Sequence, residues 1–83
     1  MIKVRFFARI RESLGREGVD IEFDSAMNSI ADVIDRVCAL NPEWESVVRD
    51  NSVLVALNQE MTHLQAKVLD EDEVALFPPV TGG

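Results

Sequence analysis

The chain has 83 residues, of which 47% are hydrophobic, and a formal net charge of −7 from 15 acidic and 8 basic residues. This length predicts one small domain, the hydrophobic content excludes a disordered chain, and no apolar run approaches the ~20 residues that cross a bilayer. Phosphate backbones and anionic lipids repel so acidic a chain, so we expect neither nucleic acid nor a membrane as a partner. A basic protein surface is the favoured partner. The alternative is that the acidic residues only keep the protein soluble.

The first residues are too charged and too alternating for a signal peptide. A single cysteine allows neither an internal disulfide nor a cysteine cluster for a metal. We therefore expect a cytoplasmic protein.

Residues 2–10 alternate in polarity, which predicts a strand with one buried face. The apolar face carries Ile2, Val4, Phe6, Ala8 and Ile10. Phe7 is an aromatic exception on the otherwise charged face. A polar connection containing Gly15 and Gly18 leads to a second alternating segment, 19–23, so the two strands suggest a hairpin.

A helix is predicted next, because apolar residues recur at helical spacing from Ile30 to Cys38. Asn28 or Ser29 can cap its start, and Pro42 favours an end at the preceding residue. A short turn or helical piece, anchored by Trp44 and Val47, should follow.

Three further strands are expected in the second half of the chain. The continuous apolar run 53–57 is typical of a strand covered on both sides, 61–63 can form a short strand, and 74–77 forms the last one before Pro78. This order predicts an α+β fold with a mixed sheet of four to five strands and one main helix packed on one face, leaving the other face partly open. Residues 1–77 would form the domain and 78–83 an extended tail.

The side chains of the domain offer little for catalysis. His63 lies in a polar turn and Cys38 lies on the apolar stripe of the helix, so neither suggests a nucleophile and its base. The run Asp70–Glu73 contains four acids in a turn, which are usually solvated rather than arranged around a cation. No glycine-rich phosphate loop is present. We expect no bound metal, no cofactor and no catalytic side chain in the domain itself.

The final residues, FPPVTGG, point to a function for the tail. Pro78 and Pro79 hold the chain extended, and the six residues from Pro78 to Gly83 reach roughly 20 Å. Gly82 and Gly83 would let the end enter a channel too narrow for side chains. Such a tail can deliver a carboxylate to the active site of another protein, where ATP could convert it to an acyl adenylate for attack by sulfur or nitrogen.

The order of elements and the tail resemble those of ubiquitin-like β-grasp proteins, and more narrowly the small sulfur-carrier subunits of molybdopterin synthase. The resemblance rests on MIKVRFFARIRESLG at the start and DEDEVALFPPVTGG at the end, and it spans the whole chain. It implies that the carboxylate of Gly83 is adenylated by a ubiquitin-activating-like adenylyltransferase and then thiocarboxylated. The resemblance further implies that the sulfur passes to a cyclic pyranopterin monophosphate precursor in the large subunit.

The same resemblance assigns roles to other residues. Gly82 would give the unobstructed approach, while ATP and Mg²⁺ would be used by the activating enzyme and sulfur would come from a desulfurase system. Partner-binding residues would form an apolar patch with a rim charge: Phe7, Arg11, Met61, Phe77, Val80 and Thr81. For Phe7, cover by a neighbouring loop is the alternative.

Three other functions remain open at the level of sequence. A sulfur carrier for thiamine synthesis also ends in two glycines. A protein modifier would join its tail to a lysine through an isopeptide bond. A β-grasp adaptor would use its surface alone.

Overall fold

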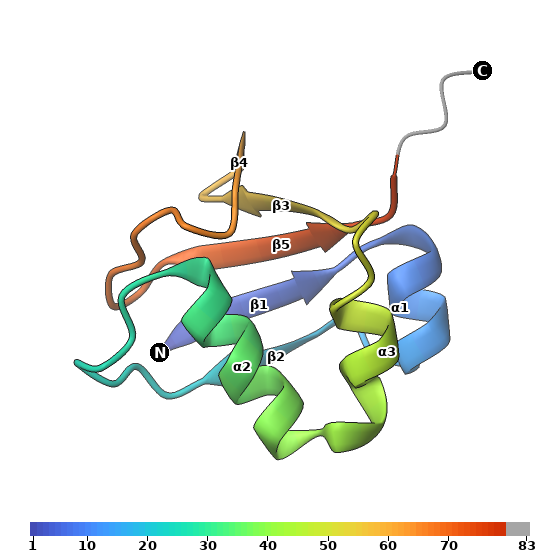
Figure 1. Ribbon diagram of the computed structural model, residues 1–83, viewed down its shortest axis with the longest axis horizontal. Helices are drawn as coiled ribbons and strands as arrows, with labels where there is room; N and C mark the ends of the chain where they lie inside the picture. Colours follow the sequence, from blue (N-terminus) through green and yellow to red (C-terminus); the bar gives the residue numbers. More distant parts are fainter. Residues whose placement is uncertain (80–83) are drawn as a thin grey trace.

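Five strands form one mixed sheet in the order β2-β1-β5-β3-β4 in the computed structural model, which describes residues 1–79 (Figure 1). The strands are β1 (Ile2–Phe6), β2 (Gly18–Ile21), β3 (Leu54–Leu57), β4 (Glu60–Thr62) and β5 (Glu73–Phe77). Strand β5 lies in the centre, parallel to β1 and antiparallel to β3. Strands β1–β2 and β3–β4 are antiparallel pairs. The predicted mixed α+β sheet is confirmed.

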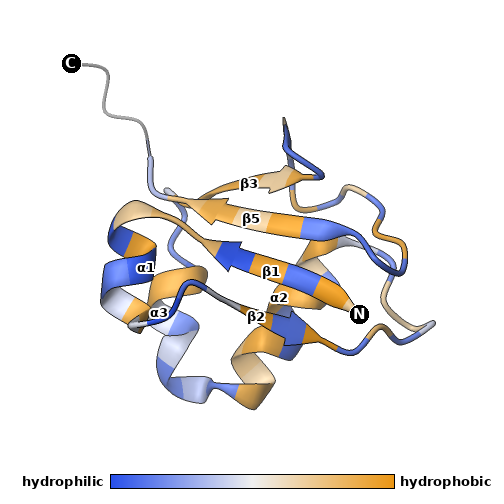
Figure 2. Ribbon diagram, turned by 180° about the vertical axis from the view of Figure 1, so that it is seen from behind, coloured by the Kyte–Doolittle hydropathy of each residue, from blue (hydrophilic) through white to orange (hydrophobic). Residues whose placement is uncertain are grey.

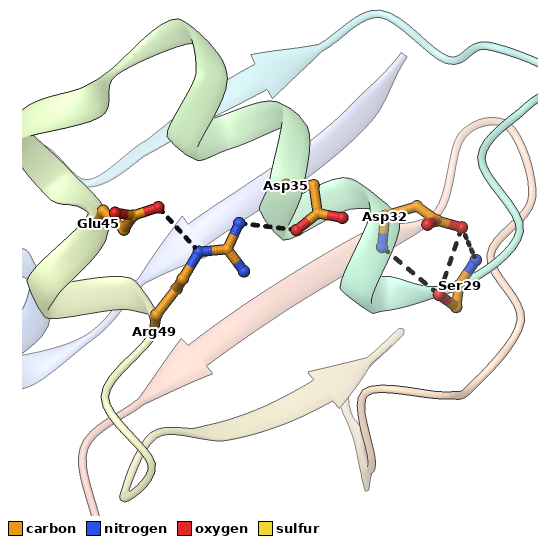
Figure 3. A network of polar contacts seen from close by, with 5 residues as sticks. All are labelled: Ser29, Asp32, Asp35, Glu45 and Arg49. Carbon is orange, nitrogen blue, oxygen red and sulfur yellow. Dashed lines mark hydrogen bonds and ion pairs between the residues drawn. The ribbon is translucent and has the colours of Figure 1, made fainter.

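Helix α2 (Ile30–Leu40) packs across one face of this sheet and buries its apolar stripe there (Figure 1). Ser29 caps its start: the backbone N–H of Asp32 donates to the Ser29 hydroxyl oxygen, and the Asp32 carboxylate accepts from the Ser29 N–H at 3.0 Å (Figure 3). This reciprocal pair satisfies backbone donors that a helix start leaves unpaired. Asn41 ends the helix before Pro42, as the sequence predicted.

A short helical segment closes one end of the core. The 3₁₀ turn η1 (Pro42–Trp44) leads into α3 (Glu45–Val48), and the Trp44 ring meets the Phe6 ring edge to face at 5.5 Å. After α3, the guanidinium of Arg49 donates to Glu45 at 3.2 Å and to Asp35 of α2 at 2.7 Å (Figure 3). Arg49 thereby joins α3 to α2 at the surface, a contact that solvent screens.

The first predicted strand is too long, because the chain leaves the sheet after Phe6 and forms α1 (Ala8–Leu14). Ala8 has a positive φ of 52°, which turns the backbone out of the strand, and its side chain is exposed rather than buried. Ile10 is still buried, now from the helix. Alternation at Phe6, Ala8 and Ile10 therefore hid a helix whose apolar positions, Ile10 and Leu14, lie one turn apart.

Two further expectations need correction. The described residues contain α1, which was not predicted, besides the main helix α2; η1 and α3 are the short helical piece that was expected around Trp44 and Val47. Strand β3 is covered on both faces only in part: Ala56 is buried, but Leu54 is 38% exposed on the face opposite α2. None of the helices in residues 1–79 is long and apolar enough to cross a membrane.

Candidate functional site

The tail begins at the end of the central strand. Strand β5 is held on both sides by β1 and β3, and the N–H of Phe7 donates to the carbonyl of Leu76 at 3.2 Å. Pro78 and Pro79 follow at once and are half-buried, beside Ile10 of α1 and Val47 of α3. The end of β5 therefore fixes the point from which the tail departs. Proline at two successive positions also removes two backbone donors there.

Phe7 and Phe77 form an aromatic pair at this end of the sheet. Their ring centroids are 4.7 Å apart with 10° between the ring planes. Both side chains lie on the face away from α2, because their chain neighbours Phe6 and Leu76 are buried in the core. Phe7 is half-buried by Phe77 rather than covered by a loop. The two rings thus present one apolar surface beside the root of the tail.

Leu54 and Met61 extend this surface across the sheet. Leu54 pairs with Phe77, and Met61 pairs with Ala56, which in turn pairs with Ala75. Met61 is 60% exposed. We call the set Phe7, Leu54, Met61 and Phe77 the open-face patch. Figure 2, seen from the side opposite to Figure 1, shows β3 and β5 as largely hydrophobic strands with α2 behind the sheet.

The open-face patch borders a hollow of about 350 Å³ whose lining includes Ala56 and Ala75. Ala56 of β3 is paired with Ala75 of β5, and these two small side chains leave the hollow open between Phe77 and Met61. At the edge of the hollow, Arg5 and Glu73 form an ion pair at 3.4 Å. An apolar centre with a charged rim is the usual composition of a protein–protein interface.

The structure brings together some of the residues expected to bind a partner. Phe7, Met61 and Phe77 line the same hollow. Arg11 lies on α1, where its guanidinium is 3.7 Å from Glu17, and it does not line that hollow. Its expected role as a rim charge stays a prediction. Val80, Thr81, Gly82 and Gly83 lie outside the described residues.

Sequence reasoning missed Leu54, because a continuous apolar run was interpreted as a strand buried on both faces. Pairing supplies the missing information: Leu54 lies opposite Phe77, which already stood out beside the prolines. The burial of β3 does not alternate, because Ala56 lies on the same face as Leu54 and is only 2% exposed. Only the Leu54 end of the strand is open.

Cys38, His63 and the acidic turn Asp70–Glu73 are the other side chains that the sequence offered for chemistry. Cys38 is buried on α2, as predicted, and burial raises the pKa of its thiol, which disfavours the reactive thiolate. His63 is exposed, also as predicted.

In the acidic turn, the amino group of Met1 donates to Asp70 at 2.7 Å and lowers the pKa of that carboxyl, while Asp72 accepts from the side-chain amide of Asn58. Within residues 1–79, no group of three or more histidine, cysteine or acidic side chains is arranged to hold a metal ion.

The mixed five-stranded sheet wrapped around one long helix, with a central last strand that leads into a glycine-terminated tail, defines a ubiquitin-like β-grasp protein. The solved structure of SAMP1, small archaeal modifier protein 1, from Haloferax volcanii has this fold. It superposes with a TM-score of 0.81 at 30% sequence identity, covering 99% of this chain and 98% of that one.

Sequence comparison identifies the family. The chain belongs to the ThiS family, whose model matches residues 4–83. It is 36% identical over 83 residues to the molybdopterin synthase sulfur carrier subunits of Escherichia coli (strain K12) and of Haemophilus influenzae, with 100% of this chain and of each relative covered. The match to both relatives therefore includes the segment 80–83.

Proposed function

We propose that this protein is the sulfur-carrier subunit of a molybdopterin synthase and carries sulfur as a thiocarboxylate on Gly83. The observation that carries the proposal is the full-length 36% identity to two molybdopterin synthase sulfur carrier subunits, ending in the pair Gly82–Gly83. The fold supports it, because the tail follows a central strand that is paired on both sides and leaves the sheet through two prolines.

The chemistry of a carboxylate requires activation before sulfur can enter. An oxygen of the Gly83 carboxylate attacks the α-phosphorus of ATP, pyrophosphate leaves, and an acyl adenylate forms. The outer sulfur of a persulfide then attacks the acyl carbon and AMP departs, which leaves an acyl disulfide. A thiol reduces its S–S bond, so that the thiocarboxylate is released and the thiol ends in a disulfide with the donor. Because this sequence consumes ATP and needs a sulfur donor, we propose an adenylyltransferase that uses ATP and Mg²⁺, and a desulfurase, as partners in the cytoplasm. The folded domain holds no cofactor of its own in this scheme.

Delivery of the sulfur needs a docking surface that aims the tail. The open-face patch lies beside Pro78 and is suited to this task, because aromatic and methionine side chains are enriched at the centres of interfaces. We propose that the large synthase subunit binds this patch while residues 80–83 enter its active site. There the sulfur passes to the cyclic pyranopterin monophosphate precursor. The catalytic side chains would then belong to the large subunit.

A second candidate is a protein modifier that forms isopeptide bonds. The similarity to a protein named small archaeal modifier protein 1 supports this second candidate. Both candidates share the acyl adenylate and differ in the nucleophile that follows, sulfur in one case and the amine of a lysine in the other.

Intact-mass spectrometry distinguishes these functions. The protein is incubated with ATP, Mg²⁺, the activating enzyme and a sulfur source, and we expect the mass increase that accompanies replacement of one oxygen by sulfur. Conjugates to lysine without that increase would instead identify a modifier. Adding the large subunit and the pterin precursor to the thiocarboxylated protein should then yield molybdopterin, whereas failure of this step alone would point to another sulfur-transfer route.

Deletion of Gly82 and Gly83 provides the matched control. We expect sulfur transfer to be lost while the thermal unfolding temperature stays the same, because β5 and its neighbours remain intact. Sulfur transfer by the shortened chain would exclude the terminal glycine as the carrier.

A further inference from the structure

The turn between β3 and β4 contains two residues in a left-handed backbone conformation. It is two residues long, because Leu57 pairs with Glu60. Asn58 has a φ of 49° and Gln59 a φ of 72°. Two positive φ angles identify a type I′ turn, in which asparagine followed by glycine is a preferred pair. Asn58 fits this preference, whereas Gln59 occupies the position where glycine would avoid the steric cost of a side chain.

Hydrogen bonds hold the turn through Asn58. Its N–H donates to the carbonyl of Glu73 at 2.8 Å, and its side-chain oxygen accepts from the N–H of Glu73 at 3.0 Å. Its side-chain amide also donates to Asp72 at 3.0 Å. Gln59 is exposed, and its carboxamide makes no hydrogen bond to any residue of the segment 1–79. The contacts within this segment therefore explain Asn58 but give no reason for a side chain on the next residue.

Gln59 lines the hollow beside the open-face patch. Because β3 runs antiparallel to β5, the β3–β4 turn lies beside Glu73 at the start of β5, whereas Phe77 ends that strand (Figure 1). Four residues of extended chain separate these two positions by about 13 Å. The stacked rings thus border the hollow at the root of the tail, and Gln59 borders it at the opposite end. A partner that covers the hollow would contact both ends.

Backbone strain that the fold itself does not require is a reason to look for a function of the strained residue. We propose that Gln59 is a partner-binding residue, whose carboxamide pairs with a backbone peptide group of the large synthase subunit. A carboxamide donates and accepts at once, as a peptide group does. The charged neighbours Arg5 and Glu73 are already paired with each other, which leaves the neutral carboxamide as the free polar group at this end of the hollow. The inference rests on the proposed function, because it takes the large subunit as the partner.

Replacement of Gln59 by glycine separates stability from binding. Gln59→Gly should raise Tm by about 4 °C, because it removes the cost of a left-handed side chain. The same change should raise the Kd for the large subunit about tenfold in isothermal titration calorimetry, as expected for the loss of one or two hydrogen bonds. An unchanged Kd would overturn the proposal. A fall in Tm would overturn it as well, since the turn itself would then require glutamine.

Two further changes at the same position identify the group that binds. Gln59→Ala removes the carboxamide without adding backbone freedom, so Tm should stay the same while Kd rises about tenfold. Gln59→Glu keeps the length and the acceptor oxygen but lacks the amide donors, and we expect a similar loss. Binding of either variant with the Kd of the unchanged protein would exclude the pairing with a peptide group.

Glu71→Gly is the matched control. Glu71 also has a positive φ, 76°, and is exposed, but it does not line the hollow. Its replacement should leave Kd unchanged. A tenfold rise in Kd for this control would show that glycine weakens binding through the backbone at any turn, and the role of the Gln59 side chain would be refuted.

The unchanged protein provides the reference that separates this inference from the proposed function. If it did not bind the large subunit at all, both would be refuted together. If it bound the large subunit and yielded molybdopterin, while Gln59→Gly and Gln59→Ala bound with the same Kd, only the role of Gln59 would be refuted.

Discussion

Phe6 and Phe7 are adjacent in the chain but point to opposite faces of the sheet. The side chain of Phe6 is 1% exposed and packs against Trp44 in the core, whereas Phe7 stacks on Phe77 at the open face. Truncating each ring to alanine therefore separates folding from binding with two chemically identical changes. We expect Phe6→Ala to impair folding and Phe7→Ala to impair binding of the large synthase subunit.

The expected magnitudes follow from burial. Phe6→Ala leaves a ring-sized cavity and should lower the free energy of unfolding by about 3–5 kcal/mol, a large share of the stability of a small domain. Phe7→Ala loses a half-buried stacked pair, so its folding cost should be about 1 kcal/mol. As an aromatic anchor beside the tail, Phe7 should contribute at least about 2 kcal/mol to binding, which corresponds to a roughly 30-fold increase in Kd.

Urea denaturation measures the folding term, and isothermal titration calorimetry with the large subunit measures the binding term. Leu69→Ala serves as the control, because Leu69 is 58% exposed outside the open-face patch and should change each free energy by less than about 0.5 kcal/mol. If Phe7→Ala lowered the unfolding free energy as much as the binding free energy, the ring would be part of the core and the docking role would be refuted.

Three further changes test how the scaffold is stabilised. Ser29→Ala removes the cap of α2 and should cost about 1 kcal/mol, seen as a fall in Tm of about 5 °C by circular dichroism. Ser25→Ala, at an exposed loop position, should leave Tm unchanged. Gly18→Ala would place a Cβ against the carbonyl oxygen of Val4, so we expect the free energy of unfolding to fall by about 1–3 kcal/mol in urea denaturation; wild-type stability would mean that the backbone at the β2 edge of the sheet shifts at little cost. Backbone N–H groups hold the pKa of Asp32 below its ordinary value of 3.8, so its contribution is present above that pH and is lost as pH falls through the lower folded-state pKa. Urea titrations between about pH 5 and pH 2 should show a smaller loss of stability for Asp32→Asn than for the unchanged protein, and parallel curves would contradict this linkage.

Several elements could be predicted from the sequence because their signals are local. The capped start of α2 depends on Ser29 and Asp32, which are three residues apart, and its end depends on Pro42. The helix α1 could not be predicted in the same way. Its first residues continue the alternation of β1, and the turn that separates them is a positive φ at Ala8, a residue that rarely adopts it.

Part of the candidate site was likewise visible in the sequence. Phe7 stood out as an aromatic residue among charges, and Phe77 stood out before the two prolines. The contact between the two rings could not be predicted, because it joins residues 70 positions apart through the parallel pairing of β1 with β5. Leu54 joined the open-face patch only through its register with Phe77.

Local patterns in the chain predicted the α+β class, the main helix and the tail, since periodicity, capping and the proline–glycine end depend on residues close together. The position of β5 at the centre of the sheet, the open-face patch at the root of the tail and the unpaired edge of β2 follow from long-range packing. Strand order and register are set by packing between distant segments, where a shift of one residue exchanges the buried face for the exposed one.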